Sequence, residues 1–356
     1  MVVPEAFEFP GARMIKAALL VAAASAAVPL SGGQTTREPR ASLAKQIGLS
    51  DPEIAAIDRG DPVVKVLPSR TPAEIFLFGA VYVNAAPEAY VRLAFDMSRL
   101  RRLPGYLAAG RFADPPTLAD LEGFSLEPND ITSLKRCRAG RCSVQLPTDA
   151  MQELQRVVDW SAADVGSQVN DETRRMALAL VRRYQLGGNG ALGTYGDKNR
   201  PVHVGERFAS LLSQSGAFPV SHPELNRYLL DYPDTTLPNV ESLFYWERVD
   251  FGLKPTLRVN HAIAYQPGDP HGAARVVAVK QLYASHYFQV ALDLAACVTD
   301  GGRASNQGFY LITLKASRQD GLTGLRGSLV RRLVVGRTRA AQERALISIK
   351  TALESR

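Results

Sequence analysis

The sequence is poor in the residues that build metal and redox sites. It contains three cysteines and five histidines in 356 residues, and the histidines do not stand at the spacing of a zinc motif. Cys137 and Cys142 flank the segment Arg-Ala-Gly-Arg, which has the length of a hairpin loop. A zinc site would need more ligands than this pair supplies, so the pair predicts a disulfide. Cys297 is expected to be a buried small apolar residue. We expect no metal and no cofactor.

The common catalytic motifs are also absent from the sequence. There is no H-E-x-x-H, no G-x-S-x-G, no P-loop and no C-x-x-C-H. Residues 188–193 spell a literal G-x-G-x-x-G, but this segment follows a predicted helix. It therefore lacks the strand-to-helix turn that aims backbone N–H groups at a pyrophosphate, and a plain loop is favoured.

Beyond residue 33 no apolar run is long enough to span a membrane as a helix. Before it, a short basic start at Met14-Ile15-Lys16 leads into an apolar stretch up to Leu30 and then into small residues. This order is typical of a cleavable secretory signal peptide. We expect an exported protein, periplasmic or secreted, in which a disulfide persists. An uncleaved N-terminal anchor is the alternative.

Charge favours no particular macromolecular partner. The chain has 42 Lys and Arg against 35 Asp and Glu, a formal net charge of +7. Its basic clusters are scattered along the chain and are not interleaved with aromatic residues, as a nucleic-acid site would require. The pattern predicts a solvated surface and no nucleic-acid binding. A weak contact with an anionic membrane surface is left open.

The hydrophobic content of 46% is that of a folded protein with a core. Changes in composition and hydrophobic periodicity divide the chain into five parts. In order, they are a leader with signal peptide, a linker with lead-in, a first α+β part, a helical insertion, and a second α+β part with the C-terminal helix. These are residues 1–33, 34–72, 73–146, 147–249 and 250–356. In the first α+β part, residues 74–84 predict a strand, Pro87 begins a helix, and the segments 131–134 and 143–146 are interpreted as hairpin arms beside the cysteines. Helices are expected in the insertion at 148–160, 171–186, 204–212, 222–230 and 240–246.

In the last third of the chain, the apolar residues recur first with the period of a strand and then with the period of a helix. From Val276 to Val298 apolar and polar residues alternate, which predicts one long strand with a bend or bulge near Ala295 and Ala296. Its polar side, which includes Gln281 and Asp293, is expected to meet water. Further strands are predicted over 254–266 and 308–317. From about 322 to 353 apolar residues recur every three or four positions, and this helical stripe is expected to face the apolar side of the strands.

Two regions resemble a known superfamily. The segment VYVNAAPEAYV at 81–91, followed by Phe95-Asp96, resembles the opening of START-like (SRPBCC) domains, where a first strand enters a helix through an Ala-Pro-Pro-Glu-type turn. The strands and helix of residues 254–354 resemble the other end of the same fold. The resemblance implies an α+β helix-grip fold, in which a curved antiparallel sheet grips a long C-terminal helix around a hydrophobic-ligand cavity. The helical insertion departs from the usual pattern, and the superfamily has no common catalytic residue to carry over.

The predicted cavity wall collects residues from the apolar sides of two strand regions. Its members are His261, Ile263, Tyr265, Leu282, His286, Phe288, Val290 and Leu292. The two histidines are either polar groups that orient a ligand or ordinary hydrogen-bonded core residues. We expect a non-catalytic binding protein for an apolar small molecule or lipid. The alternatives are a hydrolase or cyclase-type enzyme with one of these histidines as general base, and a cell-envelope scaffold that binds another protein through the helical insertion.

Overall fold

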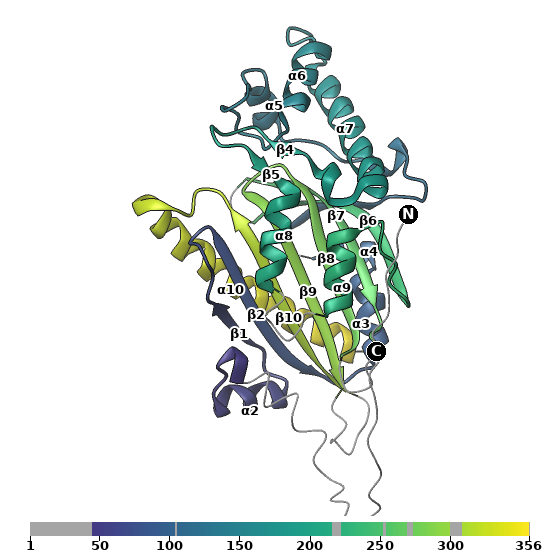
Figure 1. Cartoon of the computed structure of the whole chain (residues 1–356), viewed down its shortest axis with the longest axis vertical. Helices are drawn as coiled ribbons and strands as arrows, with labels where there is room; N and C mark the ends of the chain where they lie inside the picture. The colour runs from purple at the N-terminus through teal and green to yellow at the C-terminus, as the bar shows by residue number, and fades with distance from the viewer. Residues whose placement is uncertain are drawn as a thin grey trace, which may run out of the picture. The chain divides into compact units, whose positions relative to one another are not determined.

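The computed structural model describes residues 45–103, 105–215, 222–251, 254–268, 273–299 and 308–355. The predicted leader and signal peptide at 1–33 lie outside the described residues. All described elements belong to one unit, Thr36–Arg356, which Figure 1 shows. Among these residues, no helix combines the length and the apolar character needed to cross a membrane.

An eight-stranded antiparallel sheet forms the centre of this unit, in the order β1-β2-β10-β9-β8-β7-β6-β3. The strands are β1 (Val63–Leu67), β2 (Glu74–Val83), β3 (Tyr106–Arg111), β6 (Val240–Val249), β7 (Thr256–Tyr265), β8 (Ala273–Ala284), β9 (Phe288–Thr299) and β10 (Phe309–Gln319). Strands β6 to β10 pair in chain order, and the early strand β2 then pairs with β10. Together with the C-terminal helix, this sheet confirms the α+β class.

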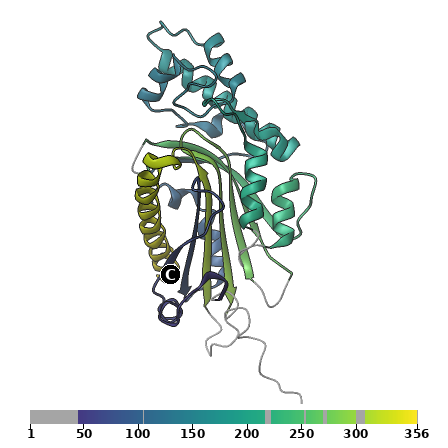
Figure 2. The same ribbon diagram turned by 60° about the vertical axis from the view of Figure 1, so that its left-hand side comes forward.

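Helices cover both faces of the sheet (Figures 1 and 2). On one face, α10 (Gly324–Glu354) lies over β1 and β2, and α3 (Pro87–Ala94) lies over β8 and β9. The short helix α4 (Met97–Leu100) follows α3 on that face and contacts β3. On the other face, α8 (Val204–Ser215) crosses β9 and β10, with α9 (Pro223–Asp231) beside it. We call these two surfaces the α10 face and the α8 face.

The remaining elements are short, apart from one long helix. They are α2 (Asp51–Arg59), η1 (Leu118–Leu121), α5 (Pro128–Leu134), α6 (Thr148–Val157), α7 (Val165–Gly187), η2 (Gly188–Leu192) and the two-stranded sheet of β4 (Thr194–Tyr195) and β5 (Val202–His203). Helices near 148–160, 171–186, 204–212 and 222–230 are thus confirmed. The disulfide between Cys137 and Cys142 is present as well, and Cys297 is free and buried.

The apolar side of the C-terminal strands does not face α10. Val290 and Leu292 pack on the α8 face, in a core cluster that includes Phe208 of α8. The α10 face receives the alternate residues, such as Cys297, which belongs to the same cluster as Leu346 of α10. The predicted pairing of apolar strand side and C-terminal helix was therefore wrong. It assumed one helical layer, whereas a sheet covered on both faces buries both sets of alternating side chains.

Helix α10 packs closely only over its second half. Leu346 lies in the core, whereas Leu329 and Leu333 of the expected stripe are 68% and 53% exposed. Close approach to the sheet depends on Gly79 of β2, because a Cβ there would lie 2.7 Å from Thr313 Oγ1 and 3.0 Å from a methyl carbon of Leu346. The apolar periodicity of the helix thus overstates its contact with the strands.

Several predicted elements differ from those in the structure. Residues 276–298 form two strands, β8 and β9, joined by a turn in which Tyr287 has φ 60°. Residues 240–246, predicted as helix, belong to β6, so the insertion ends before this strand; the aromatic-rich sequence LFYW suits a strand. Residues 131–134 end helix α5, which begins with Pro128 at its first position. Strand β1 lies in the segment expected to be a lead-in, and β3 was not predicted.

Candidate functional site

The predicted ligand-binding residues do not form one cavity wall. Six of them lie together on the α8 face and are at most 2% exposed: His261, Ile263, Tyr265, Leu282, Val290 and Leu292. They share a face, as predicted, but that face is packed with side chains of the helical layer. Phe288 and His286 lie elsewhere.

Phe288 is separated from its predicted neighbours by a β-bulge. The register between β10 and β9 shifts between Arg318 and Gln319, which breaks the alternation of side chains at this point. The Phe288 ring lies 5.7 Å from the Arg258 guanidinium carbon and contacts Phe251 edge-on. Because one extra residue reverses the facing of a side chain, the sequence pattern placed Phe288 on the wrong side.

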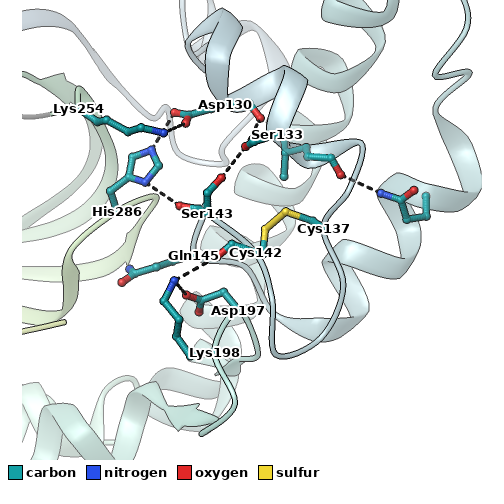
Figure 3. Close-up of a disulfide and its surroundings, with 12 residues drawn as sticks. Asp130, Ser133, Cys137, Cys142, Ser143, Gln145, Asp197, Lys198, Lys254 and His286 are labelled. Carbon is teal, nitrogen blue, oxygen red and sulfur yellow. Dashed lines mark hydrogen bonds and ion pairs between the residues drawn. A yellow bond between two sulfur atoms is a disulfide. The ribbon is translucent and has the colours of Figure 1, made fainter. Parts of the chain in front are cut away.

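His286 lies in the β8–β9 turn and connects the sheet to α5 (Figure 3). Its Nε2 is 2.8 Å from Asp130 Oδ2, and its Nδ1 is 3.2 Å from the Ser143 carbonyl oxygen. Lys254 donates a hydrogen bond to Asp130 Oδ1 at 2.9 Å. Burial alone would raise the pKa of Asp130, but hydrogen bonds from His286 and Lys254 outweigh it and lower that pKa. Both ring nitrogens of His286 face protein acceptors. Asp130, His286 and Lys254 together hold α5 against the β8–β9 turn, and we call these three residues the clamp.

Lys280 of β8 is fully buried on the α8 face. Its Nζ donates to Asn189 Oδ1 and to the Leu229 carbonyl, and lies 2.9 Å from the Tyr184 hydroxyl. The rings of Tyr184 and Phe208 lie 4.8 and 4.2 Å from Nζ. Burial lowers the pKa of Lys280 well below its ordinary value. Since its partners belong to α7, η2 and α9, this amine fastens the helical layer to the sheet.

His261 lies beside Lys280 and is enclosed by aromatic rings. It stacks on Phe244 at 4.5 Å, and its Nδ1 is 3.4 Å from the Tyr184 hydroxyl. Burial and the neighbouring Lys280 lower the pKa of His261 well below its ordinary value. The surroundings match a neutral core histidine better than a general base, which must reach a substrate proton.

The α10 face carries a row of polar side chains that crosses five strands, from β6 to β10. We call this row the polar track, and it comprises Glu247, Arg258, Asn260, Gln281, Asp293 and Lys315. Its common face follows from the register, in which Glu247 pairs with Arg258, Asn260 with Gln281, and Asp293 with Lys315. With strands about 4.8 Å apart, the four steps from β6 to β10 span roughly 19 Å.

Two ion pairs lie at the ends of the polar track. Arg258 Nη1 is 2.9 Å from Glu247 Oε1 at the buried end. Lys315 Nζ is 2.6 Å from Asp293 Oδ2 at the other end, where the two side chains are 38% and 33% exposed. The polar track therefore runs from solvent at Asp293–Lys315 to the interior at Glu247–Arg258, and its charges balance.

The interior of the polar track is incompletely hydrogen-bonded. Six buried atoms of the described residues form no hydrogen bond of normal geometry: Glu247 Oε2, Arg258 Nε, Asn260 Nδ2, Asn260 Oδ1, Gln281 Oε1 and, on α10, Gln342 Oε1. The Asn260 amide nevertheless lies close enough to the Glu247 carboxylate to lower its pKa. Folded proteins leave few buried polar atoms unpaired, because each costs about 1–3 kcal/mol. Six of the twelve such atoms among the described residues lie on this one face.

Burial also perturbs the ionisable groups around the polar track. Burial raises the pKa of Glu247, and Arg258 offsets this only in part. The phenols of Tyr106 and Tyr245 also have raised pKa values, from burial first and then from the charge of Glu247. Both phenols therefore stay neutral at physiological pH and can donate or accept a hydrogen bond.

Comparison of the chain with protein-family models, with curated proteins and with solved structures finds no match in any of the three. The START-like relationship therefore stays a prediction.

The polar track could not be found from the sequence because Gln281 was expected to meet water, whereas it is 1% exposed; Asp293, expected to meet water as well, is at the solvent end of the track. One indication was present in the sequence of β7, where Arg258 and Asn260 alternate with Leu257 and Val259. This alternation shows that the strand has a polar side. Only the tertiary structure shows that helices cover that side, because α3, α4 and α10 come from distant parts of the chain.

Proposed function

We propose that the protein binds a small, uncharged, amphipathic molecule on the polar track, without reacting with it. The observation that carries the proposal is the set of five buried polar atoms along this row that form no hydrogen bond of normal geometry with a described residue, with Gln342 Oε1 of α10 as a sixth on the same face. Functional sites are where proteins retain unsatisfied polar groups that a plain core would eliminate. The proposed function belongs to the class expected from the sequence, a small-molecule binding protein. The proposed site differs from the expected one, because it is a polar surface and not an apolar cavity wall.

The unpartnered atoms define the polar part of the ligand. Arg258 Nε and Asn260 Nδ2 offer donors, whereas Glu247 Oε2 and Gln281 Oε1 offer acceptors. A hydroxyl group both donates and accepts, so one or two hydroxyls satisfy this mixed set better than a carboxylate or an ammonium group. The balanced ion pairs likewise favour an uncharged group over an ion.

The apolar part of the ligand is expected to contact the side chains that border the polar track. On α3 and α4 these include Phe95, Met97 and Leu100, which pack with Tyr245 and Ala262. Phe288 borders the Arg258 end. Burial of an apolar moiety against such side chains contributes about 25 cal/mol per Å². A hydroxylated lipid or a similarly built apolar compound combines both features.

Export is part of this proposal. The Cys137–Cys142 disulfide is compatible with an exported protein, since structural disulfides persist in oxidising compartments. A periplasmic or secreted binding protein for an amphipathic molecule would meet its ligand outside the cytoplasm. Peptide sequencing of the mature N-terminus tests this part, and a mature chain that retains residues 1–33 would contradict it.

Native mass spectrometry of mildly purified protein tests the binding function. We expect the wild-type protein to carry a small organic molecule that organic solvent extracts. The variants Asn260→Leu and Gln281→Leu should lose it, because each removes hydrogen-bonding groups from the polar track. The control Gln152→Leu makes the same amide-to-leucine change at an exposed position of α6 and should retain it. An empty wild-type protein, or equal retention in all variants, would reject the proposal.

A further inference from the structure

A second site is a pocket of about 240 Å³ lined by residues that the polar track does not use. It lies between the loop after β4, the helix α8 and the turn-proximal ends of β9 and β10. Its charged and amide residues include Gln145, Asp197, Arg200, Arg207, Arg318 and Asp320. Drug-sized ligands occupy roughly 300–1,000 Å³, so this pocket suits a smaller molecule.

The inner wall of the pocket offers hydrogen-bond acceptors. Gln145 is only 3% exposed, and its Nε2 donates to the carbonyls of Ala284 and Phe288 at 2.9 and 3.0 Å. These two bonds fix the amide, and its Oε1 has no partner among the described residues. Figure 3 shows Gln145 close to Asp197 and Lys198, beside the disulfide.

Asp197 adds a buried carboxylate to this wall. It is 3% exposed, and its Oδ2 lies 3.3 Å from Lys198 Nζ, an ion pair without a hydrogen bond of normal geometry at that oxygen. Burial raises the pKa of Asp197, and Lys198 and Asp320 modify this in opposite directions. Gln289 donates to Asp320 Oδ1 and holds the second carboxylate in place. The inner wall is thus built to receive donor groups.

The outer rim of the pocket is basic. Arg200 and Arg207 are exposed, and neither forms an ion pair with a described residue. Arg318 is already engaged, since it bonds to Glu74 and Gln289. The two free guanidinium groups therefore provide sites for an anion, because arginine binds carboxylate groups in a bidentate manner.

We propose that this pocket binds a small zwitterion of the free α-amino acid type. The ammonium group would lie at Asp197, Asp320 and Gln145 Oε1, and the carboxylate at Arg200 and Arg207. A simple anion would leave the inner acceptors facing negative charge, and a simple cation would leave the basic rim without a partner. Only a ligand with both charges complements both ends. The inference uses other residues than the polar track and does not depend on the proposed function.

Isothermal titration calorimetry at pH 7 with each of the twenty L-amino acids, and with L-alaninamide and inorganic phosphate, tests this inference. At least one amino acid should bind wild-type protein with a Kd below about 1 mM. L-Alaninamide lacks the carboxylate and phosphate lacks the ammonium group, so both should bind at least about tenfold more weakly. Asp197→Asn and Arg207→Gln should each weaken binding by about tenfold or more.

A matched control is Arg183→Gln, which removes the same charge from an exposed position on α7 and should bind as wild type does. Arg207 is exposed on α8, so its replacement tests the pocket even if Asp197→Asn fails to fold. Two results would overturn the inference. One is the absence of heat from any amino acid at concentrations about ten times higher than 1 mM. The other is phosphate binding as tight as that of the best amino acid.

Discussion

Lys280 and Asn260 illustrate two ways in which this sheet buries a polar side chain. The amine of Lys280 has partners in three segments of the helical layer. The amide of Asn260, on the opposite face, forms no hydrogen bond of normal geometry with a described residue and has only a weak contact with Glu247. Since an unpaired buried group destabilises a fold and a paired one holds segments together, replacing these two residues by apolar ones should change stability in opposite directions.

For Asn260→Leu we expect a more stable protein in the absence of ligand. The substitution removes two unpartnered polar atoms and replaces them with a side chain of similar size, which should raise the free energy of unfolding by about 1 kcal/mol. Urea denaturation of ligand-stripped wild type and variant measures the difference. A clear loss of stability would show that protein groups already satisfy this amide.

For Lys280→Met we expect a loss of about 2–3 kcal/mol, since the carbonyl and amide acceptors around Nζ lose their donor. The effect should also depend on pH. The pKa of Lys280 is lowered in the folded state, so between that value and the unfolded value of about 10.4 the unfolded chain binds the extra proton. Wild-type stability should therefore gain from rising pH in this window.

In the Lys280→Met variant the free energy of unfolding should lack this rise with pH, because the titrating amine is absent. Urea denaturation at pH 7 and at about pH 8.5, where most tyrosines of the unfolded chain are still neutral, compares the two proteins. The stability difference between them should widen towards the higher pH. A difference that stays constant, or narrows, would contradict a lysine with a lowered pKa.

Among the elements, helix α5 depends most clearly on one polar contact for its position. Asp130 of α5 is held by His286 of the β8–β9 turn and by Lys254 at the start of the segment that leads into β7. Breaking a buried charged contact from one side is costly, because the remaining partner is left without its counter-charge. The clamp therefore couples the helical part to one end of the sheet.

Replacing Asp130 by asparagine should lower the free energy of unfolding by about 3 kcal/mol at pH 7. The pKa of Asp130 is lowered in the folded state, so its contribution is complete above the unfolded pKa of about 3.9 and is lost as pH falls through the folded value. Chemical denaturation between pH 7 and pH 2 measures this. The wild type and Asp130→Asn should converge only at the acid end, and convergence near neutral pH would contradict the clamp.

Element prediction from the sequence succeeded where a pattern is local. The alternation at 276–298 correctly indicated strand, and Pro223 and Gly187 stand near the ends of helices found close to their predicted places. It failed at the Tyr287 turn and at the Phe288 bulge, because one left-handed residue and one extra residue leave the hydrophobic pattern almost unchanged. Residues 240–246 were predicted as helix. Their apolar spacing fits the helical period and the strand period alike, and in the structure they form a strand because they pair with β7.

On the scale of the whole molecule, the arrangement of layers determines where the candidate site lies more than any sequence motif does. The sequence predicted an antiparallel sheet and a long C-terminal helix, and both are present. It could not predict that α8 and α10 cover opposite faces, because both faces of the sheet bury residues. The candidate site followed from that fact, since Gln281 looks like a surface residue until the helices of the α10 face are placed over it.

The most direct test is a high-resolution crystal structure of the protein purified under mild conditions. We expect density for a bound organic molecule on the polar track, with its polar atoms within hydrogen-bond distance of the Asn260 amide and of Gln281 Oε1. A polar track that holds only ordered water, or whose amides pair with other side chains of the protein, would contradict the proposed binding function.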